Sequence, residues 1–168
     1  GYKPIILSST GKDSMVTWYL VNKINDNTKM IFNNTTLDCA DTYKFVKIMP
    51  NVQIVTHKEG FYQWRERINF VGNRTARACC TVFKEGATIN ALNADAKYLF
   101  FMGMRNEESN TRSGYTDEWN SKKWSNNWNG ILPIRKWLEE DIWLYILYKD
   151  IPINPKYKKG YTRIGWTL

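Results

Sequence analysis

Short apolar runs alternate with segments of helical periodicity along the first two thirds of the chain. The runs predict four strands, at 4–7, 29–32, 52–55 and 98–102. "ILPI" at 131–134 is a weaker fifth candidate, because Pro133 cannot donate to a strand ladder. Apolar positions recur at helical spacing between the runs, which predicts helices at 14–24, 41–49, 61–70 and 138–148.

Strands and helices that alternate in this way require crossover connections, which favour a parallel sheet. We therefore expect an α/β fold with a doubly wound, mainly parallel five-stranded sheet and helices on both faces, formed as one domain over 1–168. Ligands of such sheets bind beyond the carboxyl ends of the strands. Two polar segments follow strands there: "LSSTGKDS" at 7–14 and "GMRNEESNTR" at 103–112. The polar, Asn-rich stretch 114–130 reads as a long ordered loop.

Charge narrows the choice of ligand. The chain has 24 Lys and Arg against 16 Asp and Glu, a net charge of +8, which indicates either an anionic ligand or a solvated basic surface. No apolar run reaches the roughly 18 residues that span a bilayer, and the first residues show no secretory signal pattern. We expect a cytoplasmic protein without a membrane partner. Three cysteines, two of them adjacent, do not suggest a disulfide framework.

The segment at 7–14 has the chemistry of a phosphate cradle. Small residues let backbone N–H groups converge on an anion, the helix that follows adds its positive end, and Lys12 supplies a full charge. Hydroxyl donors are available from Ser8, Ser9, Thr10 and Ser14. The first Gly of a Walker A loop is missing and Asp13 stands at its Ser/Thr position, so a P-loop ATPase is disfavoured.

The pattern S-S-T-G-K-D-S resembles the PP-loop, S-x-G-G-K-D-S, of the adenine nucleotide alpha-hydrolase superfamily, with Thr10 at the first Gly. Three later stretches resemble motifs of its phosphoadenylyl-sulfate (PAPS) reductase branch, in the same order. They are "NTTLDCADTYKF" (34–45), "GMRNEESNTR" (103–112) and "LPIRKWLEEDIWLYILYKDIPINPKYKKGYTRIG" (132–165). The resemblance covers nearly the whole chain and suggests a compact, phage-like member of this branch.

The resemblance implies a set of site residues. Phosphate binding is expected at Ser8, Ser9, Thr10, Gly11, Lys12 and Ser14, and contacts on the nucleoside side at Thr35, Thr36 and Gly103. Anion or substrate contacts are expected at Arg105, Arg112, Lys156 and Arg163, because guanidinium groups fork onto phosphate or sulfate oxygens. The catalytic candidates are Lys12, Asp13, Cys79 and Cys80. The alternatives are a surface ion-pair network for the first two arginines and a solvated tail for the lysines near the end.

The cysteine pair resembles the Cys-Cys segment of members that carry a four-iron cluster, in which a C-x-x-C follows "R-I-G". Here Trp166 follows Gly165, so no resident metal and no iron-sulfur cluster are expected in this chain. The family's catalytic C-terminal Cys is not found after Gly165 either, so the resemblance favours nucleotide binding over reduction. Cys79 and Cys80 could equally be buried small apolar residues.

The leading hypothesis is a PAPS-reductase-like enzyme, an oxidoreductase or transferase of sulfur metabolism. It would bind PAPS, adenylyl sulfate or ATP, with the chain from about 150 extending over the site. With ATP, Asp13 would help to hold Mg²⁺. A second hypothesis is ATP-pyrophosphatase-type sulfur transfer to nucleic acid (thiolation or phosphorothioation), with Cys79 or Cys80 as the sulfur carrier. A third is a nucleic-acid-associated binding module that uses Trp119, Trp124 and Trp128. A homodimer is compatible with each.

Overall fold

A six-stranded sheet forms the centre of the computed structural model, which describes residues 1–70, 78–120 and 124–164. Its strands are β1 (Lys3–Ser8), β2 (Lys29–Asn34), β3 (Val52–Thr56), β4 (Tyr98–Met102), β5 (Glu118–Asn120) and β6 (Trp128–Ile131). They lie in the order β3-β2-β1-β4-β6-β5, and β5 alone runs antiparallel to its neighbour. The chain reverses its winding direction at β1, which brings the carboxyl ends of β1 and β4 side by side.

Helical segments connect these strands. The α-helices are α1 (Lys12–Ile24), α2 (Ala40–Ile48), α3 (Phe61–Arg67), α4 (Ala78–Cys80), α5 (Ala87–Asn90), α6 (Asn110–Ser113) and α7 (Glu139–Lys149). A π-helical stretch, η1 (Thr81–Gly86), joins α4 to α5, and short 3₁₀ turns occur at η2 (Asn106–Glu108) and η3 (Tyr157–Lys159). None of the described helices is long and apolar enough to cross a membrane.

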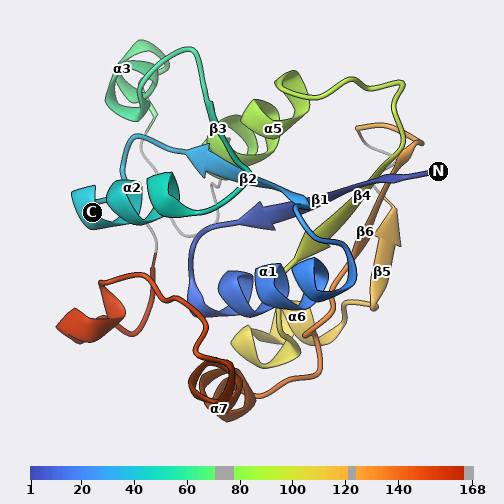
Figure 1. Cartoon of the computed structure of the whole chain (residues 1–168). Helices are drawn as coiled ribbons and strands as arrows, with labels where there is room; N and C mark the ends of the chain where they lie inside the picture. Colours follow the sequence, from blue (N-terminus) through green and yellow to red (C-terminus); the bar gives the residue numbers. More distant parts are fainter. Residues whose placement is uncertain (71–77, 121–123, 165–168) are drawn as a thin grey trace.

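Alternate residues of the central strands fill two separate cores. Ile6 of β1 and Met30 of β2 belong to a cluster with buried side chains of α1, α2 and α7. Their neighbours Ile5 and Ile31 belong to a cluster on the other face with Ala87 of α5. Figure 1 shows α1 and α2 on one side of the sheet and α5 on the other. Because both faces are covered, β1 and β2 read as continuous apolar runs rather than alternating patterns. The doubly wound α/β fold expected from the sequence is confirmed.

The sheet's far edge differs from the expectation. The stretch read as a long loop contains β5 and β6, so the sheet has six strands rather than five, and the last parallel strand ends at Ile131 instead of running through 131–134. Trp128 is buried against Tyr98, and the ring of Trp119 packs where a Cβ at Gly130 would stand. These aromatic contacts, made only after folding, convert an Asn-rich segment into strands.

The segment 78–90 is helical throughout, with its π-helical turn in the middle. Its buried residues Cys79, Phe83 and Ala87 recur every four positions, a helical spacing that the sequence analysis did not pick out. The predicted helix at 61–70 is shorter and ends at Arg67.

After α7 the chain turns back toward β1. Asp150 ends the helix in the left-handed conformation, with φ of 48°. Asn154, which is fully buried, donates hydrogen bonds from Nδ2 to Thr10 Oγ1 and to Thr42 Oγ1, both at 3.1 Å. The C-terminal segment is therefore tied to the loop after β1 and to α2.

Candidate functional site

The loop between β1 and α1 is tightly folded on itself. Thr10 has a φ of 61°, a left-handed conformation that costs a non-glycine residue about 1–2 kcal/mol. Its N–H donates to Ser8 Oγ at 3.0 Å, and its own hydroxyl accepts from Asn154. The N–H of Ser9 donates to Ser14 Oγ at 3.3 Å. Hydroxyl groups thus take up the backbone donors that the sequence offered to a phosphate.

The end of β4 approaches this loop so closely that only glycine fits at position 103. A Cβ at Gly103 would stand 2.5 Å from the carbonyl oxygen of Asp13 and 2.8 Å from the nitrogen of Ser14. The polar segment that follows β4 therefore starts against the first turn of α1. This contact brings the two segments expected to bind anions to the same place.

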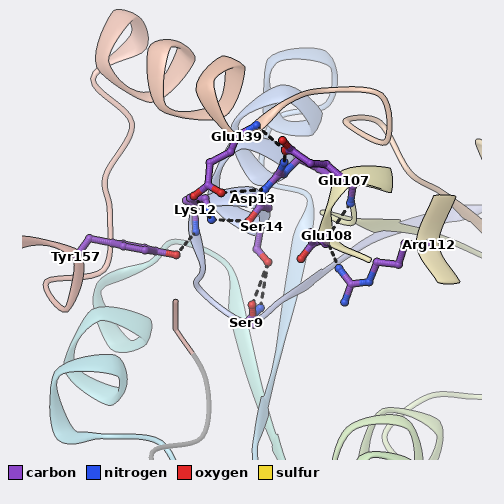
Figure 2. A network of polar contacts seen from close by, with 10 residues as sticks. Ser9, Lys12, Asp13, Ser14, Glu107, Glu108, Arg112, Glu139 and Tyr157 are labelled. Carbon is purple, nitrogen blue, oxygen red and sulfur yellow. Dashed lines mark hydrogen bonds and ion pairs between the residues drawn. The ribbon is translucent and has the colours of Figure 1, made fainter. Parts of the chain in front are cut away.

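Lys12 is buried, with 5% of its surface exposed, rather than free in an open loop. Its Nζ lies 3.2 Å from Glu139 Oε1 and 3.5 Å from Asp13 Oδ2. Its backbone N–H donates to the hydroxyl of Tyr157 at 2.9 Å (Figure 2). Burial raises the pKa of Tyr157 to about 12, so this hydroxyl keeps its proton at neutral pH and can still donate it.

Arg105 is the centre of a larger network. Its side chain is 3% exposed, its Nε lies 2.5 Å from Asp13 Oδ1, and its Nη1 pairs with Glu107. Its Nη2 is 4.0 Å from Glu139 Oε2. Burial lowers the pKa of Arg105, but the bonds to Asp13 and Glu107 outweigh it and hold the pKa above its usual value.

Arg112 pairs with Glu108 one helical turn earlier, and a third of its side chain is exposed. The carboxylate of Glu108 also accepts from the backbone N–H of Arg105 at 2.9 Å. Figure 2 shows Glu108 facing Arg112, with Glu107 on the side of the turn nearer Glu139.

An open cavity of about 1330 Å³ lies beside this network at the carboxyl ends of the strands. Most of the residues predicted for the site line it: Ser8, Ser9, Gly11, Lys12, Asp13, Ser14, Thr35, Cys80, Gly103, Arg105, Arg112 and Arg163. Thr10, Thr36, Cys79 and Lys156 are not among the lining residues. The C-terminal segment also contributes, because Tyr157 and Ile164 line the cavity.

The predicted residues outside the cavity have contacts of their own. The hydroxyl of Thr36 accepts from the N–H of Phe61 at 2.9 Å. Lys156 is 3% exposed, and its Nζ lies 4.5 Å from the centre of the Tyr161 ring. Lys156 is therefore not part of a solvated tail.

The two adjacent cysteines face different surroundings. Cys79 is buried in an aromatic cluster with Phe61, Trp64 and Phe83, and burial together with the neighbouring Cys80 raises the pKa of its thiol. Cys80 packs against the edge of the same cluster and, unlike Cys79, also lines the cavity. All three cysteines are free thiols.

The tryptophans proposed as base platforms, Trp119, Trp124 and Trp128, line the cavity and also pack against the sheet. Trp128 is 2% exposed, and Trp119 stacks on Phe100 with ring centres 6.3 Å apart. Trp124 packs against the same cluster.

Sequence reasoning missed Glu139, Tyr157 and Asn154. Glu139 belongs to an acidic run that was read only as a helix start, which it also is. Tyr157 and Asn154 lie within the motif at 132–165, but no role was predicted for either. A polar residue such as Asn154 within an apolar tail segment was the available signal.

Among the described residues, no group of three or more His, Cys, Asp or Glu side chains is placed to hold a metal ion. Both oxygens of Asp13 already face cations, Lys12 and Arg105. The expectation about cysteines following Gly165 falls outside the described residues.

A mainly parallel sheet with a reversal of winding at β1, a hydroxyl-rich loop leading into α1, and arginines that follow the neighbouring strand define a class: doubly wound α/β proteins whose candidate site lies at the carboxyl ends of the strands. A family model, the phosphoadenosine phosphosulfate reductase domain, matches residues 3–167. The chain belongs to this family.

Relatives and solved structures agree with the assignment. An uncharacterised protein of Methanocaldococcus jannaschii is 33% identical over 161 residues, 94% of this chain and 39% of that protein's length. The adenosine 5'-phosphosulfate reductase of Bacillus mycoides is 26% identical over 165 residues, 94% of this chain and 68% of that protein. The chain thus spans well under half of one relative and about two thirds of the other.

Two solved structures show the same fold. The crystal structure of phosphoadenylyl-sulfate reductase from Candida auris, a phosphate complex, matches with a TM-score of 0.74 at 17% identity, over 99% of this chain and 82% of that one. The FMN adenylyltransferase of Candida glabrata in complex with FMN and an ATP analogue matches with a TM-score of 0.65 at 16% identity, over 98% and 55%.

Proposed function

We propose that this domain binds an adenine nucleotide at the carboxyl ends of β1 and β4 and acts on it in sulfonucleotide chemistry. The observation that carries the proposal is the cavity of about 1330 Å³, which is lined by most of the loop after β1 and by three arginines, Arg105, Arg112 and Arg163. Its size exceeds that of most small-molecule sites, so a nucleotide and an acceptor fit together. The family match supports the sulfonucleotide class, and PAPS and adenylyl sulfate are its first candidates.

The roles of the residues follow from their positions. The phosphates or sulfate would lie against Lys12 and the first turn of α1, whose positive end favours anions. Arg112 and Arg163 line the same cavity and would bind a distal anionic group. The nucleoside would lie toward Thr35, beyond β2.

Titration calorimetry with PAPS, adenylyl sulfate, ATP and adenosine, with and without Mg²⁺, tests this proposal. Lys12→Met should weaken binding of the nucleotides at least tenfold and leave adenosine unaffected. Lys23→Met is the matched control, because Lys23 is an exposed lysine in the last turn of the same helix. Equal losses in the two variants would contradict the placement of phosphate at this loop.

A second candidate function is ATP-dependent transfer of sulfur, and the charge of the network favours it. Carboxylates outnumber cations here, since Asp13, Glu107, Glu108 and Glu139 surround Lys12, Arg105 and Arg112. Mg²⁺ bound to the nucleotide's phosphates would neutralise part of their charge and so reduce their repulsion by these carboxylates. The acceptor would attack the α-phosphorus, the bond to the β-phosphate would break, and pyrophosphate would leave.

Cys80 would carry the sulfur in this case, because it is the cysteine of the pair that faces the cavity. ATP binding that strengthens with Mg²⁺, combined with release of pyrophosphate when an acceptor nucleic acid is added, would select this function. Tight binding of PAPS that ignores Mg²⁺ would select the first.

A further inference from the structure

Glu139 occupies the position where an anionic ligand would meet the loop lysine. Its Oε1 lies 3.2 Å from Lys12 Nζ, and its Oε2 lies 4.0 Å from Arg105 Nη2. Figure 2 shows its side chain reaching down from the start of α7 to Lys12, opposite Tyr157. A carboxylate between two buried cations has the charge and the size of one edge of a phosphate or sulfate group.

We propose that Glu139 is a displaceable counter-ion that holds Lys12 in the nucleotide-free protein and competes with the ligand's phosphate or sulfate for it. Glu139 thereby sets the affinity of the site for anions. This inference rests on the proposed nucleotide binding at the same loop. It assigns to α7 a part in ligand affinity that its sequence, read as an ordinary helix start, did not suggest.

Of the two carboxylates that pair with Lys12, Glu139 is the more exposed and can therefore be displaced by a ligand. Its side chain is 49% exposed, whereas that of Asp13 is 15% exposed and is held by Arg105 at 2.5 Å. Lys12 itself is 7% exposed in its side chain, so it cannot move into solvent to meet a ligand. The ligand must therefore reach Lys12 inside the cavity, and the half-exposed side chain of Glu139 must move away from it.

The backbone allows this exchange without moving the helix. The N–H of Glu139 donates to Glu107 Oε2 at 2.9 Å, which fixes the start of α7. Only the side chain of Glu139 would rotate outward. In solvent it would keep its favourable place in the first turn of α7, where acidic side chains stabilise a helix. The exchange therefore trades one ion pair of Lys12 for another.

The test compares Glu139→Gln with Glu140→Gln. Glu140 is exposed in the same turn of α7 and forms no ion pair with the described residues, so its variant removes the same charge without touching Lys12. Affinities for ATP, inorganic pyrophosphate and adenosine are measured by calorimetry at about 0.15 M salt, where charges more than about 8 Å apart are largely screened. Circular dichroism confirms that both variants fold.

Glu139→Gln should bind ATP and pyrophosphate about threefold to fivefold more tightly than the unmodified protein, the effect of removing one partly exposed ion pair. Glu140→Gln should change these affinities by less than about 1.5-fold. Adenosine, which lacks a phosphate, should bind all three proteins equally.

Two results overturn the inference in distinguishable ways. If the unmodified protein binds ATP and Glu139→Gln binds it no better than Glu140→Gln, or binds it more weakly, Glu139 does not compete with the ligand and the proposed function stands. If neither the unmodified protein nor Glu139→Gln binds ATP or pyrophosphate, both the nucleotide site and the counter-ion role are wrong.

Discussion

Replacing Arg105 with lysine tests whether the network at the strand ends is structural as well as functional. Arg105 reaches from the end of β4 to Asp13 in the first turn of α1 and to Glu107. A guanidinium serves both carboxylates with separate N–H groups in a fixed plane. A lysine at this position keeps the charge but presents one compact ammonium, so one of the two partners loses its bond.

The buried contact between Arg105 and Asp13 decides how far the free energy of unfolding falls. The Arg105 and Asp13 side chains are 3% and 15% exposed, so their charge-assisted hydrogen bond is poorly replaced by water. Losing such a bond costs about 1.5–3 kcal/mol. The contacts to Glu107 and Glu139 involve carboxylates that are nearly half exposed and add little. We expect Arg105→Lys to lower the free energy of unfolding by about 1.5–3 kcal/mol, or the melting temperature by roughly 3–12 °C.

Urea unfolding followed by tryptophan fluorescence measures this loss. Arg112→Lys is the control, because Arg112 pairs with Glu108 within one turn and is 33% exposed. Its variant should lose less than about 0.5 kcal/mol. Equal stability of the two variants would refute the argument that burial makes Arg105 a structural link. A loss of nucleotide affinity without loss of stability would place Arg105 in ligand binding alone.

Three further predictions each concern a single residue. Lys12→Met should weaken nucleotide binding at least tenfold in calorimetry. It should cost little stability, because Glu139 is 49% exposed and Asp13 keeps its ion pair with Arg105. Gly103→Ala should destabilise the fold by more than about 1 kcal/mol in urea, because its Cβ would meet the carbonyl of Asp13 at 2.5 Å; unchanged unfolding would show that β4 can shift away. Cys39 should be alkylated faster than Cys79 and at lower pH, as followed by mass spectrometry. Burial raises the pKa of the Cys39 thiol, but hydrogen bonds from Thr42 and the charge of Lys156 outweigh it and leave the pKa below its usual value, so its reactive thiolate forms earlier as pH rises. Burial raises the pKa of Cys79, so the reverse order would contradict both directions.

Local sequence was enough for the central strands and for the loop after β1. The run 30–32 is fully buried, and the runs 4–7 and 98–102 consist of buried and half-buried residues, because helices cover both faces of the sheet. The order of strands and helices then placed "LSSTGKDS" and "GMRNEESNTR" at one edge of the sheet, because parallel strands share their carboxyl ends. The expectation that arginines and the loop meet at one cavity came from this topology.

Which charged and polar groups contact one another at the site was decided by the tertiary structure alone. The acidic run at 139–141 does not indicate that its first carboxylate reaches Lys12. Nor does the sequence around Tyr157 indicate that its hydroxyl accepts a hydrogen bond from the Lys12 N–H. Both contacts join residues more than 100 positions apart, so their geometry depends on how α7 packs on α1. The same holds for β5 and β6, which exist because Trp119 and Trp128 find aromatic partners across the sheet. Sequence patterns report burial and local periodicity, whereas ion pairs and edge strands depend on which surfaces the folded core brings together.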